Sequence, residues 1–161
     1  MLGRPSVHDN PLIARLVEFG LERDDFVLFG SAPLLAHGLR QDIRDLDVVA
    51  RGRAWRHVSS IGIPGVGVVS GDRVVQFWGG RIQFSSGWIA PTCDADELID
   101  NADVVEGLRF ASLSNVLAYK RALGRRKDLA DIRKILAATG PPPHVPTSPE
   151  PDTGRPASTT A

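Results

Sequence analysis

The chain has 161 residues, which is the usual size of one domain. Its 19 basic and 19 acidic side chains balance, so no net positive charge indicates nucleic-acid binding, although a local basic patch stays possible. Cys93 is the only cysteine, which excludes a disulfide framework and a cysteine-based zinc site.

The chain carries no sign of a membrane or export segment. No stretch approaches the roughly 20 apolar residues of a membrane span. The first ten residues, MLGRPSVHDN, lack the apolar core of a signal peptide. We therefore expect a soluble, cytoplasmic protein with no membrane partner.

The composition changes after residue 139. Residues 140–161 carry seven of the chain's 12 prolines and almost no large apolar residue. Such a segment cannot bury enough apolar surface to offset its ordering entropy, which predicts a disordered Pro-rich tail. The alternative is a proline-rich ligand for a protein partner. The folded domain is then expected to span residues 8–139.

The first half of this domain alternates helical and extended patterns. Asn10, followed by proline, predicts the start of a helix whose apolar residues recur at helical spacing up to Gly20. The run 25–30 predicts a buried strand, and 31–38 a short helix capped by Ser31. The run 45–50 predicts a second strand.

The second half predicts a hairpin and three helices. Gly79-Gly80 separates two apolar runs, 73–78 and 81–86, which is typical of a two-residue hairpin turn. Helices are expected at about 97–102, 112–123 and 126–138. These elements predict an α/β (α+β) fold, a mixed β-sheet flanked by helices with two closing C-terminal helices.

Two carboxylates stand at the beginning of the second strand. Side chains alternate along a strand, so Asp45 and Asp47 share one face. Two carboxylates so close repel each other unless a cation lies between them, and Mg²⁺ or Mn²⁺ suits such a pair. The alternative is a charged strand end that only limits edge pairing.

Gly30 and Ser31 end the first strand. A glycine there lets the backbone approach a phosphate, and the next helix offers free N–H groups to an anion. The Ser31 hydroxyl adds a further donor. The same dipeptide is also an ordinary turn.

Together these motifs resemble the nucleotidyltransferase superfamily related to DNA polymerase beta. The resemblance rests on FGSAPLLAHGLRQDIRDLDVV, where Gly30-Ser31 precedes Asp45-Leu46-Asp47 by thirteen residues. It is similar to the small bacterial branch of minimal and toxin-associated members. The resemblance implies that Asp45 and Asp47 hold magnesium and that Gly30 and Ser31 hold a nucleoside triphosphate.

A second block, SLSNVLAYKRALGRRKDLADIRKIL (112–136), resembles the closing helices of that branch. Lys120 and Asp128 project from largely apolar helix faces. They either pair with each other, as buried charges require, or Lys120 or Lys127 reaches the nucleotide phosphates. Arg40 and Arg44 either steer the triphosphate or balance the carboxylates.

One expected carboxylate is absent. Members that catalyse transfer usually carry a third acid on the strand after the hairpin, but this chain has Gln83 on the polar face there. Glutamine accepts a hydrogen bond but cannot act as a base.

Three hypotheses therefore stay open. The first is transfer of a nucleoside monophosphate from NTP to a small molecule, RNA or protein. The second is a catalytically impaired nucleotide- or partner-binding module, and the third is a metal-dependent phosphohydrolase.

Overall fold

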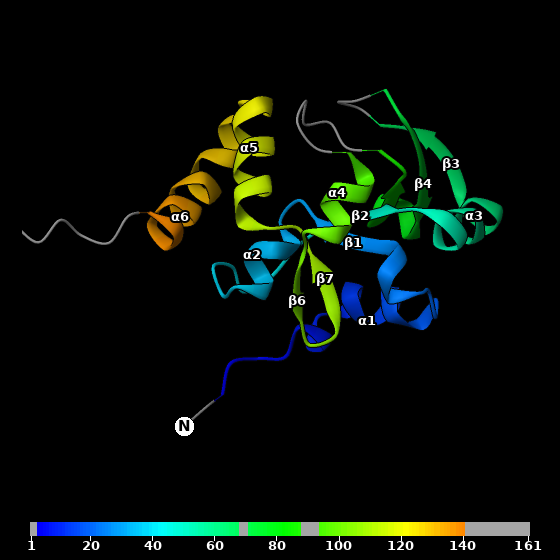
Figure 1. Cartoon of the computed structure of the whole chain (residues 1–161), viewed down its shortest axis with the longest axis horizontal. Helices are drawn as coiled ribbons and strands as arrows, with labels where there is room; N and C mark the ends of the chain where they lie inside the picture. The colour runs from blue at the N-terminus through cyan, green and yellow to red at the C-terminus, as the bar shows by residue number, and fades with distance from the viewer. Residues whose placement is uncertain (1–2, 68–70, 88–93, 141–161) are drawn as a thin grey trace, which may run out of the picture.

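The computed structural model describes residues 3–67, 71–87 and 94–140 (Figure 1). The predicted Pro-rich tail lies outside these residues, apart from Gly140. The helices are α1 (Pro11–Glu18), α2 (Ala32–Ala36), α3 (Gly52–Ile61), α4 (Ala95–Asp100), α5 (Leu113–Leu123) and α6 (Leu129–Thr139). Short 3₁₀ turns are η1 (Val7–Asp9), η2 (Arg23–Asp25), η3 (Trp78–Gly80) and η4 (Arg126–Asp128). No helix of the described residues is both long and apolar enough to span a bilayer.

The described residues form a mixed sheet of seven strands in the order β3-β4-β5-β2-β1-β7-β6. The strands are β1 (Phe26–Phe29), β2 (Leu46–Ala50), β3 (Ile63–Val66), β4 (Arg73–Phe77), β5 (Ile82–Ser85), β6 (Asp103–Val105) and β7 (Leu108–Phe110). The central strand β2 runs antiparallel to β1 and parallel to β5. The predicted α/β fold, a mixed sheet with flanking helices and two closing helices, is confirmed.

Helices cover both faces of the sheet, which explains why β1 is apolar at every position. Phe26 and Leu28 belong to one apolar core together with side chains of α1 and α3. Val27 and Phe29 belong to a second core together with side chains of α4, α5 and α6. Figure 1 shows α1 and α5 on opposite sides of β1. Successive strand residues thus pack on opposite layers.

Helix ends follow the predicted signals. The Asn10 side chain accepts hydrogen bonds from the backbone N–H groups of Leu12 and Ile13 at the start of α1. Ser112 caps α5 in the same way, and Gly124, with φ of 60°, ends it in the left-handed conformation. The helix predicted at 126–138 is instead η4 followed by α6.

The predicted hairpin exists, but its turn is longer than two residues. β4 pairs antiparallel with β5, with Phe77 opposite Ile82, so four residues connect the strands. Gly79 and Gly80 both have positive φ, as the turn requires. Trp78 also has positive φ, and its ring packs near Phe19 and under the Arg15 guanidinium, 4.9 Å from the ring centre. These contacts attach the turn to α1.

The sequence reasoning missed the strands β3, β6 and β7. β3 contains proline and glycine, which argue against a strand, and it lies at an edge of the sheet where such residues are tolerated. β6 and β7 are three residues each. Their connection, Glu106-Gly107, has positive φ at both residues, the backbone of a tight hairpin turn.

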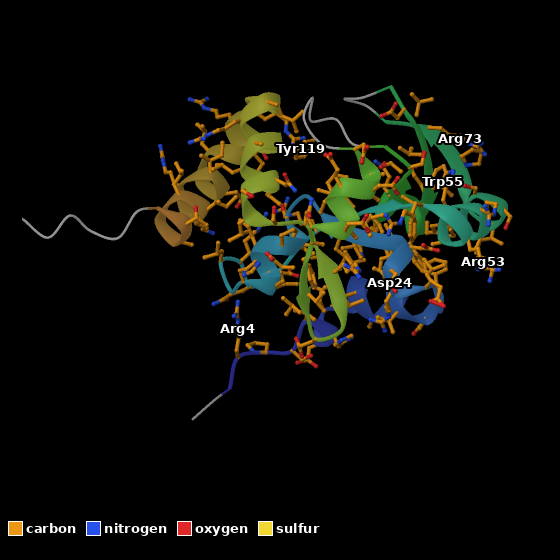
Figure 2. The ribbon with its side chains drawn as sticks, in the orientation of Figure 1. Arg4, Asp24, Arg53, Trp55, Arg73 and Tyr119 are labelled. Carbon is orange, nitrogen blue, oxygen red and sulfur yellow. The ribbon has the colours of Figure 1, made fainter. Side chains whose placement is uncertain are left out.

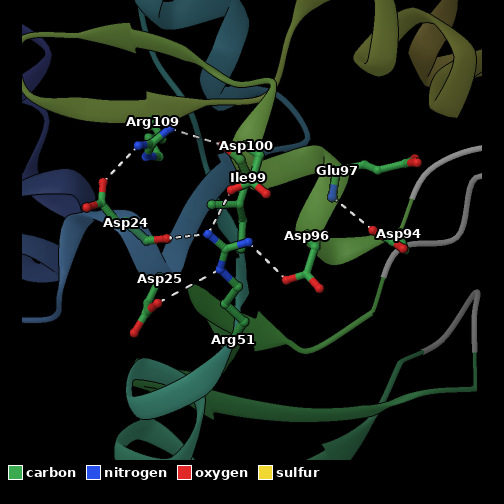
Figure 3. Close-up of polar contacts among 9 residues, drawn as sticks. All are labelled: Asp24, Asp25, Arg51, Asp94, Asp96, Glu97, Ile99, Asp100 and Arg109. Carbon is green, nitrogen blue, oxygen red and sulfur yellow. Dashed lines mark hydrogen bonds and ion pairs between the residues drawn. The ribbon is translucent and has the colours of Figure 1, made fainter.

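An ion-pair network holds α4 against the start of β1 and the end of β2 (Figure 3). Arg51 donates to Asp96 at 2.9 Å and to Asp100 at 2.8 Å, both on α4. Arg51 Nη2, which binds Asp100, also donates to the backbone carbonyl of Asp24 at 2.9 Å. Arg109 on β7 donates to the Asp24 side chain at 2.8 Å. We assign this network to the placement of α4, because its carboxylates already have arginine partners.

Candidate functional site

The Gly30-Ser31 turn connects β1 to α2. Gly30 has φ of +68°, a conformation that favours glycine. Ser31 occupies the N-cap position of α2, but its side chain makes no capping bond, so the predicted capping role is wrong. Its Oγ instead accepts a hydrogen bond from Arg40 Nη1 at 2.9 Å. Ser31 and Arg40 both line the cavity described below.

Asp47 lies directly beside this turn. The antiparallel register pairs Phe29 with Asp47. A methyl group added to Gly30 would stand 2.7 Å from Asp47 Oδ2, so the carboxylate occupies the space that a side chain at Gly30 would need. Asp45 precedes the strand and is exposed. The structure therefore places the glycine turn and the Asp pair at one point of the sheet, as predicted.

Burial changes the acidity of Asp47. It raises the pKa of this carboxyl to about 6, and the negative charge of Asp45 acts in the same direction. The positive charges of Arg125, Lys120 and Lys127 oppose the shift. In this environment the charged Asp47 gains from any further cation.

Gln83 is the neighbour of Asp47 across the sheet. The parallel register of β2 and β5 pairs the two residues directly. The register therefore places Gln83 beside Asp47, one of the two carboxylates that the prediction named. Gln83 Oε1 accepts a hydrogen bond from Gln76 Nε2 on β4 at 3.0 Å. The described residues contain no cluster of three acidic, histidine or cysteine side chains with metal-binding geometry.

Lys120 and Asp128 form a buried ion pair, as one of the two predicted alternatives required. Lys120 Nζ lies 3.1 Å from Asp128 Oδ1 and 3.2 Å from Asp131 Oδ2. Arg125 donates to Asp128 from Nε at 2.7 Å. Burial acts to raise the pKa of Asp128, but the hydrogen bonds from Arg125 and Lys120 outweigh it and lower the pKa. Asp128 therefore stays ionised as an ion-pair partner.

A cavity of about 540 Å³ opens over these groups. Every site residue predicted from the sequence lines it: Gly30, Ser31, Arg44, Asp45, Asp47, Gln83, Lys120, Lys127 and Asp128. They come from the ends of β1 and β2 and from β5 on one side, and from α5 with η4 on the other. The structure thus brings together two sequence blocks about 70 residues apart.

Sequence reasoning assigned no role in the site to several lining residues. Asp131 and Arg125 lie in the cavity beside Lys120. Tyr119 extends from α5 toward the sheet (Figure 2), and its ring centre is 5.9 Å from that of Phe29. Burial raises the pKa of the Tyr119 hydroxyl, with the Asp47 charge in support. Asp131 follows Asp128 by three residues, a helical spacing that could have indicated it.

The donor set fits a divalent cation. Asp45, just before β2, and Asp47, on β2, bring two carboxylates into one cavity, and the Gln83 amide lies beside Asp47. Mg²⁺ is commonly held by one or two carboxylates, with water and substrate phosphates completing the shell.

Comparisons with known proteins add one structural likeness. No family model and no curated protein sequence matches this chain. A solved structure from Thermotoga maritima, provisionally described as a nucleotidyltransferase, is 16% identical with a TM-score of 0.48. The match covers 80% of this chain and 94% of that one.

Proposed function

We propose that this protein is a nucleotidyltransferase that uses Mg²⁺ to transfer a nucleoside monophosphate from NTP to an acceptor hydroxyl. One observation carries the proposal: the Asp47 carboxylate fills the side-chain space of Gly30, inside a cavity rich in cationic side chains. The sequence resemblance to the superfamily, including its small bacterial branch, supports the same activity.

The cavity suits a triphosphate by charge. Its lining carries five cationic side chains and four carboxylates, namely Arg40, Arg44, Lys120, Arg125 and Lys127 against Asp45, Asp47, Asp128 and Asp131. Lys120 and Arg125 are already paired with carboxylates. Lys127 and Arg44 are exposed, so they are the cations we assign to direct phosphate contact.

Asp45 and Asp47 would hold the metal ion, which supplies charge neutralisation for the phosphates. The Gly30 turn and the Ser31 hydroxyl would bind phosphate oxygens and fix the α-phosphorus in line with the acceptor. The acceptor oxygen then forms a bond to this phosphorus, the bond to the bridging oxygen breaks, and pyrophosphate leaves. The hydroxyl proton passes to solvent, because Gln83 cannot take it.

The Gln83 amide favours a second candidate, a nucleotide-binding or partner-binding module that has lost efficient chemistry. The position beside Asp47 carries an amide already bonded to Gln76, not a third acid. This candidate keeps the phosphate and metal contacts and gives up the turnover. The acceptor, whether small molecule, RNA or protein, belongs only to the first candidate.

The test is pyrophosphate release by the purified full chain with Mg²⁺, each of the four NTPs and a panel of acceptors. We expect turnover in the wild type and its loss in the Asp45→Ala, Asp47→Ala double variant. Asp103→Asn serves as the control, because it removes an exposed carboxylate that lies outside the cavity. The Asp103 carboxylate pairs with His37.

Each other outcome identifies a different function. NTP binding without turnover over the whole panel would favour the binding module. Release of inorganic phosphate would indicate the phosphohydrolase. Turnover that survives the double variant would contradict the assignment of the Asp pair.

A further inference from the structure

We propose that Arg40 and Asp131 are positioning residues that hold the Ser31 hydroxyl as a hydrogen-bond donor to the triphosphate. The inference rests on the proposed function and adds to it a defined orientation of one phosphate-binding group. Neither residue needs to touch the nucleotide for this role.

The orientation follows from the chemistry of the guanidinium group. Arg40 Nη1 lies 2.9 Å from Ser31 Oγ. A guanidinium carries donors only, so Ser31 must accept in this contact. One lone pair of Oγ is thereby occupied, and its hydrogen stays available. Because Ser31 does not cap α2 and does line the cavity, the O–H group can donate to an anion there.

Asp131 fixes Arg40 in this contact. The same Nη1 atom lies 3.3 Å from Asp131 Oδ2, so its two hydrogens serve the serine and the carboxylate. The Arg40 side chain is 32% exposed, whereas that of Asp131 is only 9% exposed. A long, half-exposed side chain loses rotamer freedom when it is held, and a buried carboxylate partner offsets that cost.

Lys120 fixes Asp131 in turn. The buried ammonium group lies 3.2 Å from Asp131 Oδ2 and 3.1 Å from Asp128 Oδ1. A continuous series of charged contacts therefore runs from α5 and α6 to the turn after β1. Its last member is the serine hydroxyl in the cavity.

Arg44 provides the matched comparison. It carries the same charge and lines the same cavity, but among the described residues no ion pair or hydrogen bond involves its side chain. Loss of either arginine weakens anion binding through charge alone. Only the loss of Arg40 should depend on the presence of the Ser31 hydroxyl.

The experiment is a pair of double-mutant cycles on the full chain. The dissociation constant of inorganic tripolyphosphate with Mg²⁺ is measured by calorimetry for wild type, Ser31→Ala, Arg40→Met and the double variant. The second cycle replaces Arg40→Met by Arg44→Met. We expect Ser31→Ala to weaken binding about tenfold, the usual effect of one charge-assisted hydrogen bond. The loss of tripolyphosphate affinity caused by Arg40→Met should then be at least about threefold smaller in the Ser31→Ala background than in the wild type.

A second variant keeps the test valid where Arg40→Met fails to fold, as shown by its melting curve. Asp131→Asn preserves the shape of the side chain and leaves Lys120 paired with Asp128. It should weaken tripolyphosphate binding in wild type and have less effect in Ser31→Ala.

The outcomes separate this inference from the proposed function. Coupling in the Arg40 cycle with additivity in the Arg44 cycle supports the inference. Additivity in both cycles overturns it and leaves the proposed function standing. If the wild type binds neither tripolyphosphate nor any NTP, the proposed function fails and this inference fails with it.

Discussion

At the scale of single residues, Gly30 combines two constraints that sequence alone could not separate. Its φ of +68° disfavours any side chain, and the Asp47 carboxylate occupies the space a methyl group would need. Gly30→Ala should destabilise the fold by about 1–2 kcal/mol through backbone strain, and it should also displace Asp47. We expect a lower melting temperature together with loss of Mg²⁺-dependent NTP binding.

Gly20→Ala is the matched control for this prediction. Gly20 has φ of +64°, and a methyl group there would meet no atom within 4 Å. It should lose similar stability and keep ligand binding. Equal loss of binding in the two variants would contradict the contact between Gly30 and Asp47.

Gln83→Asp tests the vacant acidic position. The variant places a third carboxylate beside Asp47, where repulsion should lower stability in EDTA and a bound cation should restore it. We expect a larger rise of melting temperature on Mg²⁺ addition than in the wild type. Gln83→Asn is the control, because it shortens the side chain equally without adding charge. Equal Mg²⁺ responses in Gln83→Asp and the wild type would show that this position does not complete the site.

The residues of the candidate site were easier to predict from the sequence than the contacts between their side chains. Gly30, Ser31, Asp45 and Asp47 belong to local motifs at the ends of two predicted strands, and the antiparallel pairing of these strands brings the motifs together. The pairing of Arg40 with Asp131 could not be predicted, because it joins segments 91 residues apart through side-chain geometry. Whether a cation pairs with its neighbour or with a distant carboxylate depends on packing, which a sequence pattern does not contain.

At the scale of elements, loss of the Asn10 cap of α1 should lower stability without changing ligand binding. Its Oδ1 accepts from Leu12 N at 3.0 Å and Ile13 N at 3.3 Å, and α1 packs on the core opposite α5. Asn10→Ala should cost about 1 kcal/mol of unfolding free energy. Chemical denaturation should show this loss, while the affinity for NTP stays unchanged.

Asn10→Ser is the control, since serine restores a capping oxygen. It should recover most of the stability. No difference between the alanine and serine variants would mean that the cap does not stabilise α1.

Elements with strong periodicity or clear caps were predictable, and edge strands were not. β1, β2, α1 and α5 have long apolar runs or capping residues that decide their conformation locally. β3 is mostly exposed and includes proline, so its pairing with β4 rather than its own sequence makes it a strand. β6 and β7 depend on a two-residue turn in which Glu106 has a left-handed conformation. Glutamate rarely adopts this conformation, so the sequence does not indicate the turn.

At the scale of the whole molecule, Asp47 makes stability depend on pH. Its folded pKa of about 6 exceeds the ordinary value of 3.8, so the folded state binds the proton more tightly than the unfolded state. Stability without metal should therefore fall as pH rises from about 4 to 6 and stay lower above that window, by at most about 3 kcal/mol. Asp47→Asn removes this cost, and its unfolding free energy should exceed that of the wild type at pH 7.5 but not at pH 4.

Mg²⁺ distinguishes this effect from a general change in packing. At pH 7.5 the ion should stabilise the wild type and leave Asp47→Asn nearly unaffected. Equal pH profiles for the two proteins in EDTA would contradict the raised pKa of Asp47.

The attachment of Trp78 to α1 keeps one wall of the cavity rigid. The β4–β5 turn is held to Phe19 and Arg15 on the layer remote from α5, so β5 and Gln83 cannot shift without breaking aromatic packing. The sheet thus forms a rigid wall of the cavity. On the other side, α5 and α6 pack on the sheet through the second apolar core, and charged contacts join them to the turn after β1, so the lining groups are held on both sides before any ligand binds.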